Sequence, residues 1–342
     1  MENSPAGAPN PALVFETLQA HQRTAALRAA IELDLFRALG DAPVTAAAIA
    51  EACQSSERGI RILCDFLTIV GIVAKQDGGY KHSPSSAAFL DPRSPMCMAA
   101  TARFLGLPAM QEPYNHLADI VRNGRTSMPG EGSVEPENPV WVEFAHSMAP
   151  MMAPMSGPLG AIVLDGLHGP IRVLDIAAGH GLFGIAVGKQ NKEAIVQALD
   201  WASVLAVAQA NAQAAGIGDR YQTLPGSAFD VPFEGPYNLV LLTNFLHHFD
   251  PPTNTELLRK VYAALHPGGR VAILEFVPND DRISPPGPAA FALTMLASTA
   301  SGDAYPFSAL QSMLDAAGFG NVTAQPVPMG PHTVVMANRG PA

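Results

Sequence analysis

The chain has 342 residues, of which 48% are hydrophobic and 15% charged, and 30 acidic against 20 basic residues give a net charge of −10. This length predicts two domains, and an acidic chain without a strong basic patch argues against a nucleic-acid partner. Three scattered cysteines exclude a disulfide framework, and we find neither a run of about 18 uncharged apolar residues nor a signal-peptide pattern, so we predict a cytoplasmic protein with no membrane partner.

The first hundred residues have the pattern of a winged helix, that is, three helices followed by a two-stranded ribbon. Apolar residues recur at helical spacing, hydroxyl side chains precede two helices as N-caps, and Asp-Gly-Gly separates the strands as a turn. The predicted helices run from Pro11 to about Leu39, from Thr45 and from Ser56, and the predicted strands are 72–75 and 80–82.

A winged helix suggests DNA binding, so the charge of its third helix decides between two readings. That helix offers only Arg58 and Arg61, beside Glu57 and Asp65. Binding to DNA depends on neutralising phosphates, and this surface can neutralise few of them. We therefore predict that residues 1–100 form a winged-helix-like dimerisation domain.

A helical, methionine-rich segment over residues 101–165 follows, and the loop Pro129–Pro139 interrupts it. Phe144, Met148 and Met152 are four residues apart and share one helix face. This face is either the wall of a substrate pocket or ordinary core, since methionine suits both. The segment is predicted to link the domains and to contribute to the pocket.

Strands and helices alternate from Pro170 onward, which predicts an α/β domain over residues 166–342. Its fold is expected to be a Rossmann-like, doubly wound and mainly parallel sheet with a possible antiparallel pair at one edge. The predicted strands are 171–176, 194–199, 220–224, 237–242, 270–277, 322–327 and 332–337, and the predicted helices are 182–190, 204–215, 253–265, 288–299 and 306–317.

The turn after the first of these strands is rich in glycine. Gly179, Gly181 and Gly184 satisfy G-x-G-x-x-G, the dinucleotide fingerprint, which alone is a weak signal. Asp175 lies at the strand end, where a nicotinamide-binding fold normally runs apolar into its first glycine. Asp200 follows Asp175 by 25 residues and closes the second strand, where a carboxylate can accept from both hydroxyls of a ribose.

This half of the chain resembles the class I S-adenosylmethionine-dependent methyltransferases. The whole chain is similar to the small-molecule O-methyltransferases with an N-terminal winged-helix dimerisation domain. The resemblance implies S-adenosylmethionine as cofactor, a homodimer and a small-molecule acceptor. Alanine stands at 177 and 178 where many members have glycine, and Thr243 replaces a lysine of plant-type members. After the third strand, where many relatives place an aspartate, the aligned stretch is Gly226-Ser227-Ala228-Phe229. The implied cofactor-binding residues are Asp175, Ala177, Gly179, Gly181, Asp200, Trp201, Ser227, Ala228, Phe229, Thr243 and Asn244.

The resemblance also implies the catalytic residues. His247 stands where the family has its general base, and Glu275, 28 residues later, where it has the carboxylate that orients the base. Neutral imidazole is a suitable base for a hydroxyl at neutral pH, and a carboxylate on Nδ1 would fix its tautomer. The family's second acid aligns with Ala304, so Asp303 is a possible substitute near the pocket.

Other roles are open for the histidine turn. His248 replaces an aspartate of the family and is expected to cap the next helix or face solvent, with pocket lining as the alternative. A metal site at His247, His248 and Asp250 is disfavoured, because adjacent residues on a turn diverge and no third histidine lies nearby in the sequence.

The sequence thus predicts a metal-independent methyltransferase of a hydroxyl or phenol. An S- or N-methyltransferase would bind the same cofactor without needing a base, and some relatives keep the cofactor without transferring methyl. A nicotinamide-dependent oxidoreductase and a winged-helix regulator are less favoured. The identity of the acceptor cannot be read from one sequence.

Overall fold

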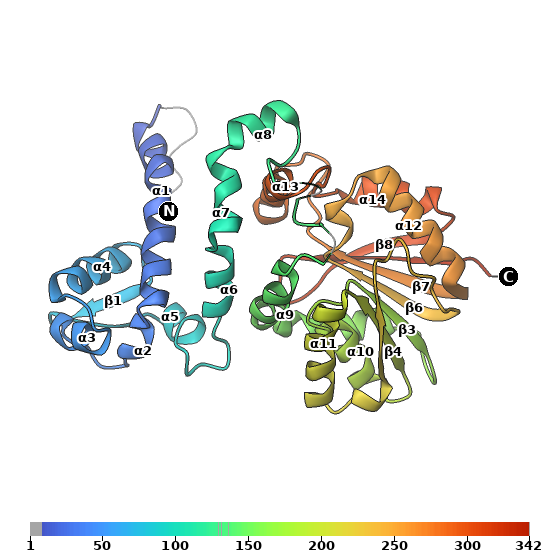
Figure 1. Cartoon of the computed structure of the whole chain (residues 1–342), viewed down its shortest axis with the longest axis horizontal. Coiled ribbons are helices and arrows are strands. Elements are labelled where there is room, and N and C mark those ends of the chain that lie inside the picture. Colours follow the sequence, from blue (N-terminus) through green and yellow to red (C-terminus); the bar gives the residue numbers. More distant parts are fainter. Residues whose placement is uncertain (1–8, 129, 131, 136, 342) are drawn as a thin grey trace. The chain divides into compact units, whose positions relative to one another are not determined.

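The computed structural model describes residues 9–341 except 129, 131 and 136, so three positions of the predicted loop Pro129–Pro139 lie outside the described residues. The chain divides into two compact units, Met1–Leu107 and Pro108–Ala342, which are coloured blue to cyan and cyan to red in Figure 1. The first unit therefore ends close to the predicted domain boundary at residue 100.

Local side-chain chemistry sets the elements of the first unit. Thr45 and Ser56 accept from the amides of Ala48 and Gly59, as predicted for N-caps. The ribbon turns at Asp77-Gly78, whose φ values of 50° and 77° are those of a two-residue type I′ hairpin. The elements are α1 (Pro11–Glu32), α2 (Leu35–Ala38), α3 (Ala46–Ala52), α4 (Glu57–Ile69), β1 (Val73–Gln76), β2 (Gly79–His82), α5 (Pro84–Phe89) and α6 (Ala99–Leu105).

The prediction of one helix from Pro11 to Leu39 is wrong, because the chain breaks between α1 and α2. Asp34 adopts a left-handed conformation with φ 53°, the Leu33 amide donates to the Ala29 carbonyl, and the Asp34 amide donates to the Ile31 carbonyl. The Asp34 carboxylate then accepts from Arg37 at 2.5 Å. Aspartate tolerates this conformation better than most residues, so the break costs little free energy.

The second unit begins with α7 (Pro108–Asn115), α8 (Leu117–Asn123) and α9 (Val140–Leu164). By length and composition α9 could cross a membrane, although polar residues and prolines interrupt its apolar runs. However, α9 contains Pro150, Pro154 and Pro158 and packs against two helices of the sheet domain, and core helices pass the same test. We draw no membrane role from it.

A seven-stranded sheet forms the core of the second unit, with strand order β5-β4-β3-β6-β7-β9-β8. The first five strands of this order are parallel and the last two pair antiparallel, as predicted. The strands are β3 (Arg172–Ile176), β4 (Ile195–Asp200), β5 (Tyr221–Pro225), β6 (Tyr237–Thr243), β7 (Leu265–Glu275), β8 (Gly320–Pro326) and β9 (Thr333–Asn338).

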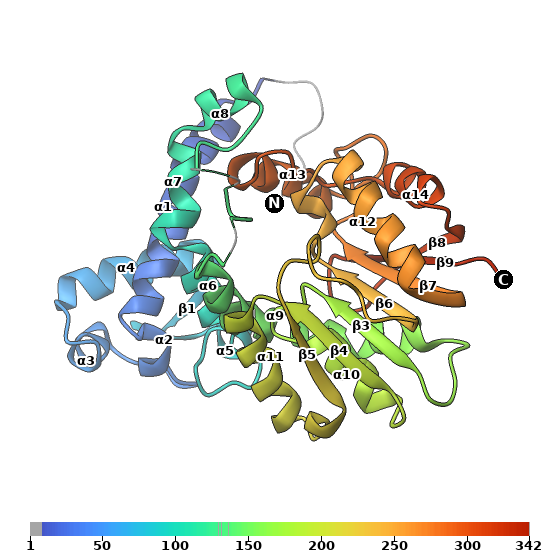
Figure 2. The ribbon, with the colours of Figure 1, turned by 45° about the vertical axis from the view of Figure 1, so that its right-hand side comes forward.

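Helices cover both faces of this sheet. Because side chains alternate along a strand, Leu174 and Ile176 pack with α12 (Pro251–Ala264) and α14 (Phe307–Ala316), which lie side by side in Figures 1 and 2. Asp175 points to the opposite face, where α10 (Leu182–Gln190) and α11 (Ala202–Ala214) lie together with α9. The remaining helix, α13 (Pro286–Ser298), contacts α7 and α8. The carboxyl ends of the parallel strands thus share one edge, where open sheets bind ligands.

Candidate active site

Left-handed backbone shapes the turn between β3 and α10. Gly179 and Gly181 have φ values of 56° and 75°, and Gly181 begins the helix as its N-cap. A Cβ at Gly181 would lie 2.6 Å from the Tyr221 hydroxyl, so glycine is required there for space as well as for conformation. Ala177 keeps φ at 53° although it has a Cβ, at a cost of about 1 kcal/mol.

Asp200 lies at the end of β4 and is fixed to this turn. Its two carboxylate oxygens accept from the amides of Gly179 at 2.8 Å and Trp201 at 2.7 Å. Burial raises the pKa of Asp200 to about 6, against the lowering effect of these two hydrogen bonds. A carboxylate has lone pairs beyond those used here, so Asp200 can still accept from a bound diol.

Asp175 is fully buried below the turn, one residue before the end of β3. It accepts from the Gly184 amide at 3.1 Å, and burial raises its pKa to about 7. Its second oxygen and the Tyr221 hydroxyl are buried without a hydrogen-bond partner among the described residues. Tyr221 was not singled out in the sequence, because only the fold brings β5 against this turn.

The loop after β5 holds the other predicted cofactor residues. Ser227 Oγ accepts from the Phe229 amide at 3.1 Å, Ala228 is buried, and the half-exposed Phe229 ring packs against Phe249 with centroids 4.9 Å apart. Lys260 on α12 donates to the carbonyls of Ala228, Phe229 and Val231 at 2.9, 3.0 and 2.6 Å. No local sequence pattern predicts this contact of Lys260, which lies 29 to 32 residues from the three positions it bonds.

The predicted base follows β6 at the same edge of the sheet. Thr243 ends the strand, Asn244 turns the chain with φ 54°, and the short helix η2 (Leu246–His248) places His247. His247 Nδ1 lies 2.5 Å from Glu275 Oε2 at the end of β7, and both side chains are buried. Glu275 Oε1 also accepts from the amides of Phe245 at 3.0 Å and His247 at 3.3 Å, so one carboxylate holds the turn and the ring.

This contact determines which nitrogen of His247 can act as a base. A carboxylate accepts hydrogen bonds, so the hydrogen resides on Nδ1 and Nε2 keeps its lone pair. The ring packs edge-on to Phe291 of α13, with centroids 4.9 Å apart, and Phe291 stacks on Phe276 at 4.3 Å. Phe276 in turn contacts His332, whose Nε2 lies 2.9 Å from Asn244 Oδ1. No local sequence pattern predicts Phe291, Phe276 or His332 at this site, because their contacts are between distant segments.

The expectation that His248 caps a helix or faces solvent is wrong. Asp250 is the N-cap of α12 and accepts from Thr253, whereas His248 is only 9% exposed. Its ring contacts those of His247 and Trp141, with centroids 4.3 and 5.5 Å apart.

Asp303 does not direct its carboxylate to His247. The carboxylate pairs with Arg282 at 2.6 Å and accepts from the Ala304 amide, while only the Asp303 backbone amide reaches the His247 carbonyl, at 3.0 Å. The structure therefore does not bring a second acid to the base at this position.

The predicted face of α9 is mostly buried. Met148 and Met152 are 6% and 4% exposed, while the half-buried Phe144 contacts Trp141 edge-on at 5.4 Å. Trp141 contacts His248, and both Trp141 and Trp201 pack against the apolar cluster of Ala145, Val204 and Val207. Trp141 was missed in the sequence, since a lone tryptophan on an apolar helix has no distinguishing pattern.

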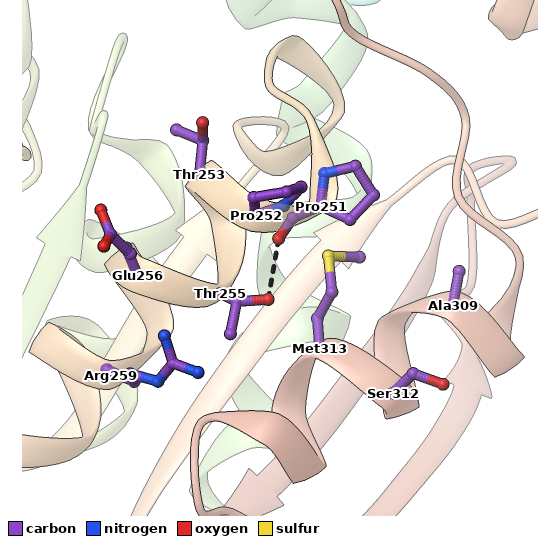
Figure 3. Close-up of a pocket in the computed structure, with 9 residues that line it drawn as sticks. All are labelled: Pro251, Pro252, Thr253, Thr255, Glu256, Arg259, Ala309, Ser312 and Met313. Atoms are coloured by element: carbon purple, nitrogen blue, oxygen red, sulfur yellow. Dashed lines mark hydrogen bonds between the residues drawn. The ribbon is translucent and has the colours of Figure 1, made fainter.

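Two further observations concern other possible sites. Among the described residues no group of three or more His, Cys, Asp or Glu side chains could hold a metal ion. Figure 3 shows an open depression between α12 and α14 that is lined by Pro251, Thr255, Arg259 and Met313, with Thr255 bonded to the Pro251 carbonyl. None of the predicted site residues lines it.

Comparisons with known proteins identify relatives of both units. Residues 15–92 match the family model of an O-methyltransferase dimerisation domain, and residues 173–269 match that of a methyltransferase domain. Acetylserotonin O-methyltransferase of Mus musculus is 29% identical over 332 residues, covering 92% of this chain and 84% of that protein. The 3-hydroxy-5-methyl-1-naphthoate 3-O-methyltransferase of Streptomyces sahachiroi is 27% identical, covering 84% of each.

Solved structures of O-methyltransferases share the fold of this chain. The crystal structure of a candidate O-methyltransferase from Nostoc punctiforme superposes with a TM-score of 0.94 at 45% identity, covering 97% of this chain and 100% of that one. Human N-acetylserotonin methyltransferase, solved with S-adenosylmethionine, shares the fold with a TM-score of 0.84 at 21% identity, covering 99% and 100%.

Proposed function

The chain belongs to the S-adenosylmethionine-dependent O-methyltransferases of small molecules that have an N-terminal dimerisation domain, and from this premise we propose its mechanism. A homodimer methylates a hydroxyl or phenol, with His247 as general base, Glu275 as its positioning residue and no metal ion. The observation that supports this most strongly is the buried His247–Glu275 pair at the carboxyl edge of the sheet. An S- or N-methyltransferase would need no such base.

The residues around the glycine turn fit the cofactor. Gly179 leaves room for a ligand against the backbone, whereas the space beside Gly181 is filled by Tyr221 and Ala208. Asp200 has spare lone pairs for the ribose diol, and Phe229 offers a ring to the adenine. When bound, S-adenosylmethionine supplies a methyl group that is already electrophilic because it is attached to a positively charged sulfur. The protein therefore has to align the acceptor and remove its proton.

The chain's own groups perform these two tasks. Glu275 fixes the His247 ring so that the lone pair of Nε2 can take the hydroxyl proton, and it then stabilises the imidazolium. Phe291 from α13 and the α9 face with Phe144, Met148 and Met152 are proposed as walls of the acceptor site. Asp303 is proposed to pair with Arg282 near this site rather than to act as a second acid beside His247.

The test measures S-adenosylhomocysteine formation with a mixed panel of phenols, thiols and amines, in the presence of EDTA. We expect turnover of phenols that EDTA does not reduce. His247→Ala should abolish it while cofactor affinity, measured by calorimetry, stays nearly intact. A fully active His247→Ala enzyme would remove the base assignment, and inhibition by EDTA would remove metal independence.

The positioning role of Glu275 has its own matched pair of variants. Glu275→Gln keeps an acceptor for the backbone amides but loses the charge that stabilises the imidazolium, so kcat should fall about a hundredfold or more. Asp303→Asn, which changes a nearby carboxylate that faces Arg282, should stay within a few-fold of the original enzyme. Equal losses in both variants would contradict the assignment.

A further inference from the structure

The mechanism above leaves His248 without a task, although the fold buries it beside the base. Its ring is tilted 57° to that of His247, with centroids 4.3 Å apart. It caps no helix, and Glu275 is engaged with His247 rather than with His248. Its Nδ1 is buried and has no hydrogen-bond partner in the described part of the chain. A buried imidazole that no side-chain hydrogen bond engages among the described residues is unusual, and its other ring nitrogen, Nε2, is the one free to meet a ligand.

The environment of His248 fixes its charge and its tautomer. Burial, and secondarily the neighbouring His247, lower the pKa of His248 well below the ordinary value, so the ring is neutral at pH 7. A neutral imidazole has one N–H group, and burying that group unpaired is costly. The tautomer with hydrogen on Nε2 avoids burying an unpaired Nδ1–H, so Nε2–H is the donor that His248 can offer to a ligand.

Aromatic rings flank the two histidines. The edge of Trp141 from α9 meets His248 at an interplanar angle of 79°, and Phe291 from α13 meets His247 at 83°. Such rings favour a flat, aromatic acceptor. An acceptor bound here faces two neighbouring imidazoles with complementary functions: a lone pair on His247 and an N–H on His248.

We propose that His248 determines acceptor specificity by hydrogen bonding to a second oxygen, on the carbon next to the hydroxyl that is methylated. His247 Nε2 receives the proton of the reacting hydroxyl while His248 Nε2–H donates to its neighbour. The acceptor class is then an aromatic ring with vicinal oxygens, such as a catechol or an ortho-hydroxy carbonyl compound. The proposal adds no covalent step, and it rests on the function proposed above.

Three naphthols of similar shape test this: naphthalene-2,3-diol with vicinal oxygens, naphthalene-2,7-diol with separated ones, and 2-naphthol. S-adenosylhomocysteine formation is measured for each, with EDTA present so that chelation of a metal by vicinal oxygens cannot create a preference. We expect kcat/KM to be roughly tenfold higher for the 2,3-diol than for the 2,7-diol, the worth of about one hydrogen bond.

Two variants separate hydrogen bonding from shape. His248→Phe keeps an aromatic ring but has no donor, so the ratio of kcat/KM for the 2,3-diol to that for the 2,7-diol should fall to about one, whatever the change in the absolute rates. His248→Gln places an amide N–H close to the position of Nε2 and should retain part of the preference. Thermal melting checks that both variants fold, and the glutamine variant decides if the phenylalanine variant does not.

The outcomes distinguish this inference from the function on which it rests. Equal kcat/KM for the two diols, or a preference that survives His248→Phe, overturns the two-oxygen proposal and leaves the methyltransferase with its base intact. No S-adenosylhomocysteine from any phenol, despite normal cofactor binding, overturns both.

Discussion

Burial sets the protonation state of His332, a residue near the proposed base His247. His332 precedes β9, is 1% exposed, shares a hydrogen bond with Asn244 and packs on Phe276 at 4.1 Å. Burial lowers the pKa of His332 to about 4. The folded protein thus keeps this ring neutral at a pH where an unfolded chain would protonate it.

The sign of the resulting pH dependence follows from the direction of that shift. Between about pH 6.5 and 4 the unfolded chain binds the extra proton, so the contribution of His332 to stability is lost as the pH falls through this window. His332→Gln can still donate to Asn244 but does not titrate. From pH 7 to pH 5, its free energy of unfolding relative to the original protein should improve by about 2 kcal/mol.

Urea denaturation at several pH values measures this difference. His332→Phe, which neither titrates nor bonds to Asn244, should show the same pH trend from a lower starting stability. A difference that stays constant between pH 7 and pH 5 would contradict the assignment of a buried, neutral ring.

At the scale of elements, α12 organises the loop that is proposed to contact the adenine. Lys260 donates to three carbonyls of that loop, those of Ala228, Phe229 and Val231. Lys260→Met should weaken cofactor binding by roughly tenfold and raise its KM more than it lowers kcat, because the loop loses its order but the base is untouched. Lys260→Arg should restore part of the affinity.

Calorimetry with S-adenosylmethionine measures this effect. The matched control is Arg259→Met on the same helix, since Arg259 lines the open depression of Figure 3 and bonds to Ala316 rather than to the loop. Unchanged affinity in Lys260→Met, or an equal loss in Arg259→Met, would exclude the positioning role.

From residue 170 onward the predicted helices and strands agree with the structure to within two residues, because apolar periodicity and glycine turns mark them locally, except that β7 begins at Leu265 rather than at 270. The break at Asp34 was not, since apolar residues continue at helical spacing across it. The family resemblance placed His247 and Glu275 together, which the geometry matches at 2.5 Å. By contrast, Lys260, Trp141 and His332 enter the site through contacts between distant segments, and no local pattern predicts those.

At the scale of the whole molecule, part of the large apolar content of the chain is exposed on the surface of α1. Leu13, Val14, Phe15 and Leu18 are 60–68% exposed on this helix. A depression lined by Gln22, Ala26, Ile62 and Phe66 continues between α1 and α4. Clustered apolar exposure of this kind is typical of a surface that a partner covers.

We expect α1 to contribute to the proposed homodimer, so a charged face should separate the protomers. The double variant Phe15→Glu, Leu18→Glu adds two carboxylates that would be costly to bury in an interface. Light scattering coupled to gel filtration should give twice the 35.8 kDa chain mass for the original protein and one chain mass for the variant. Met329→Glu, at a 74% exposed position outside the first unit, should stay dimeric.

Cofactor binding should survive in the monomer, because the glycine turn, Asp200 and the loop held by Lys260 all lie within the second unit. A monomeric original protein would contradict the dimer, whereas a double variant that remains dimeric would exclude α1 from the interface.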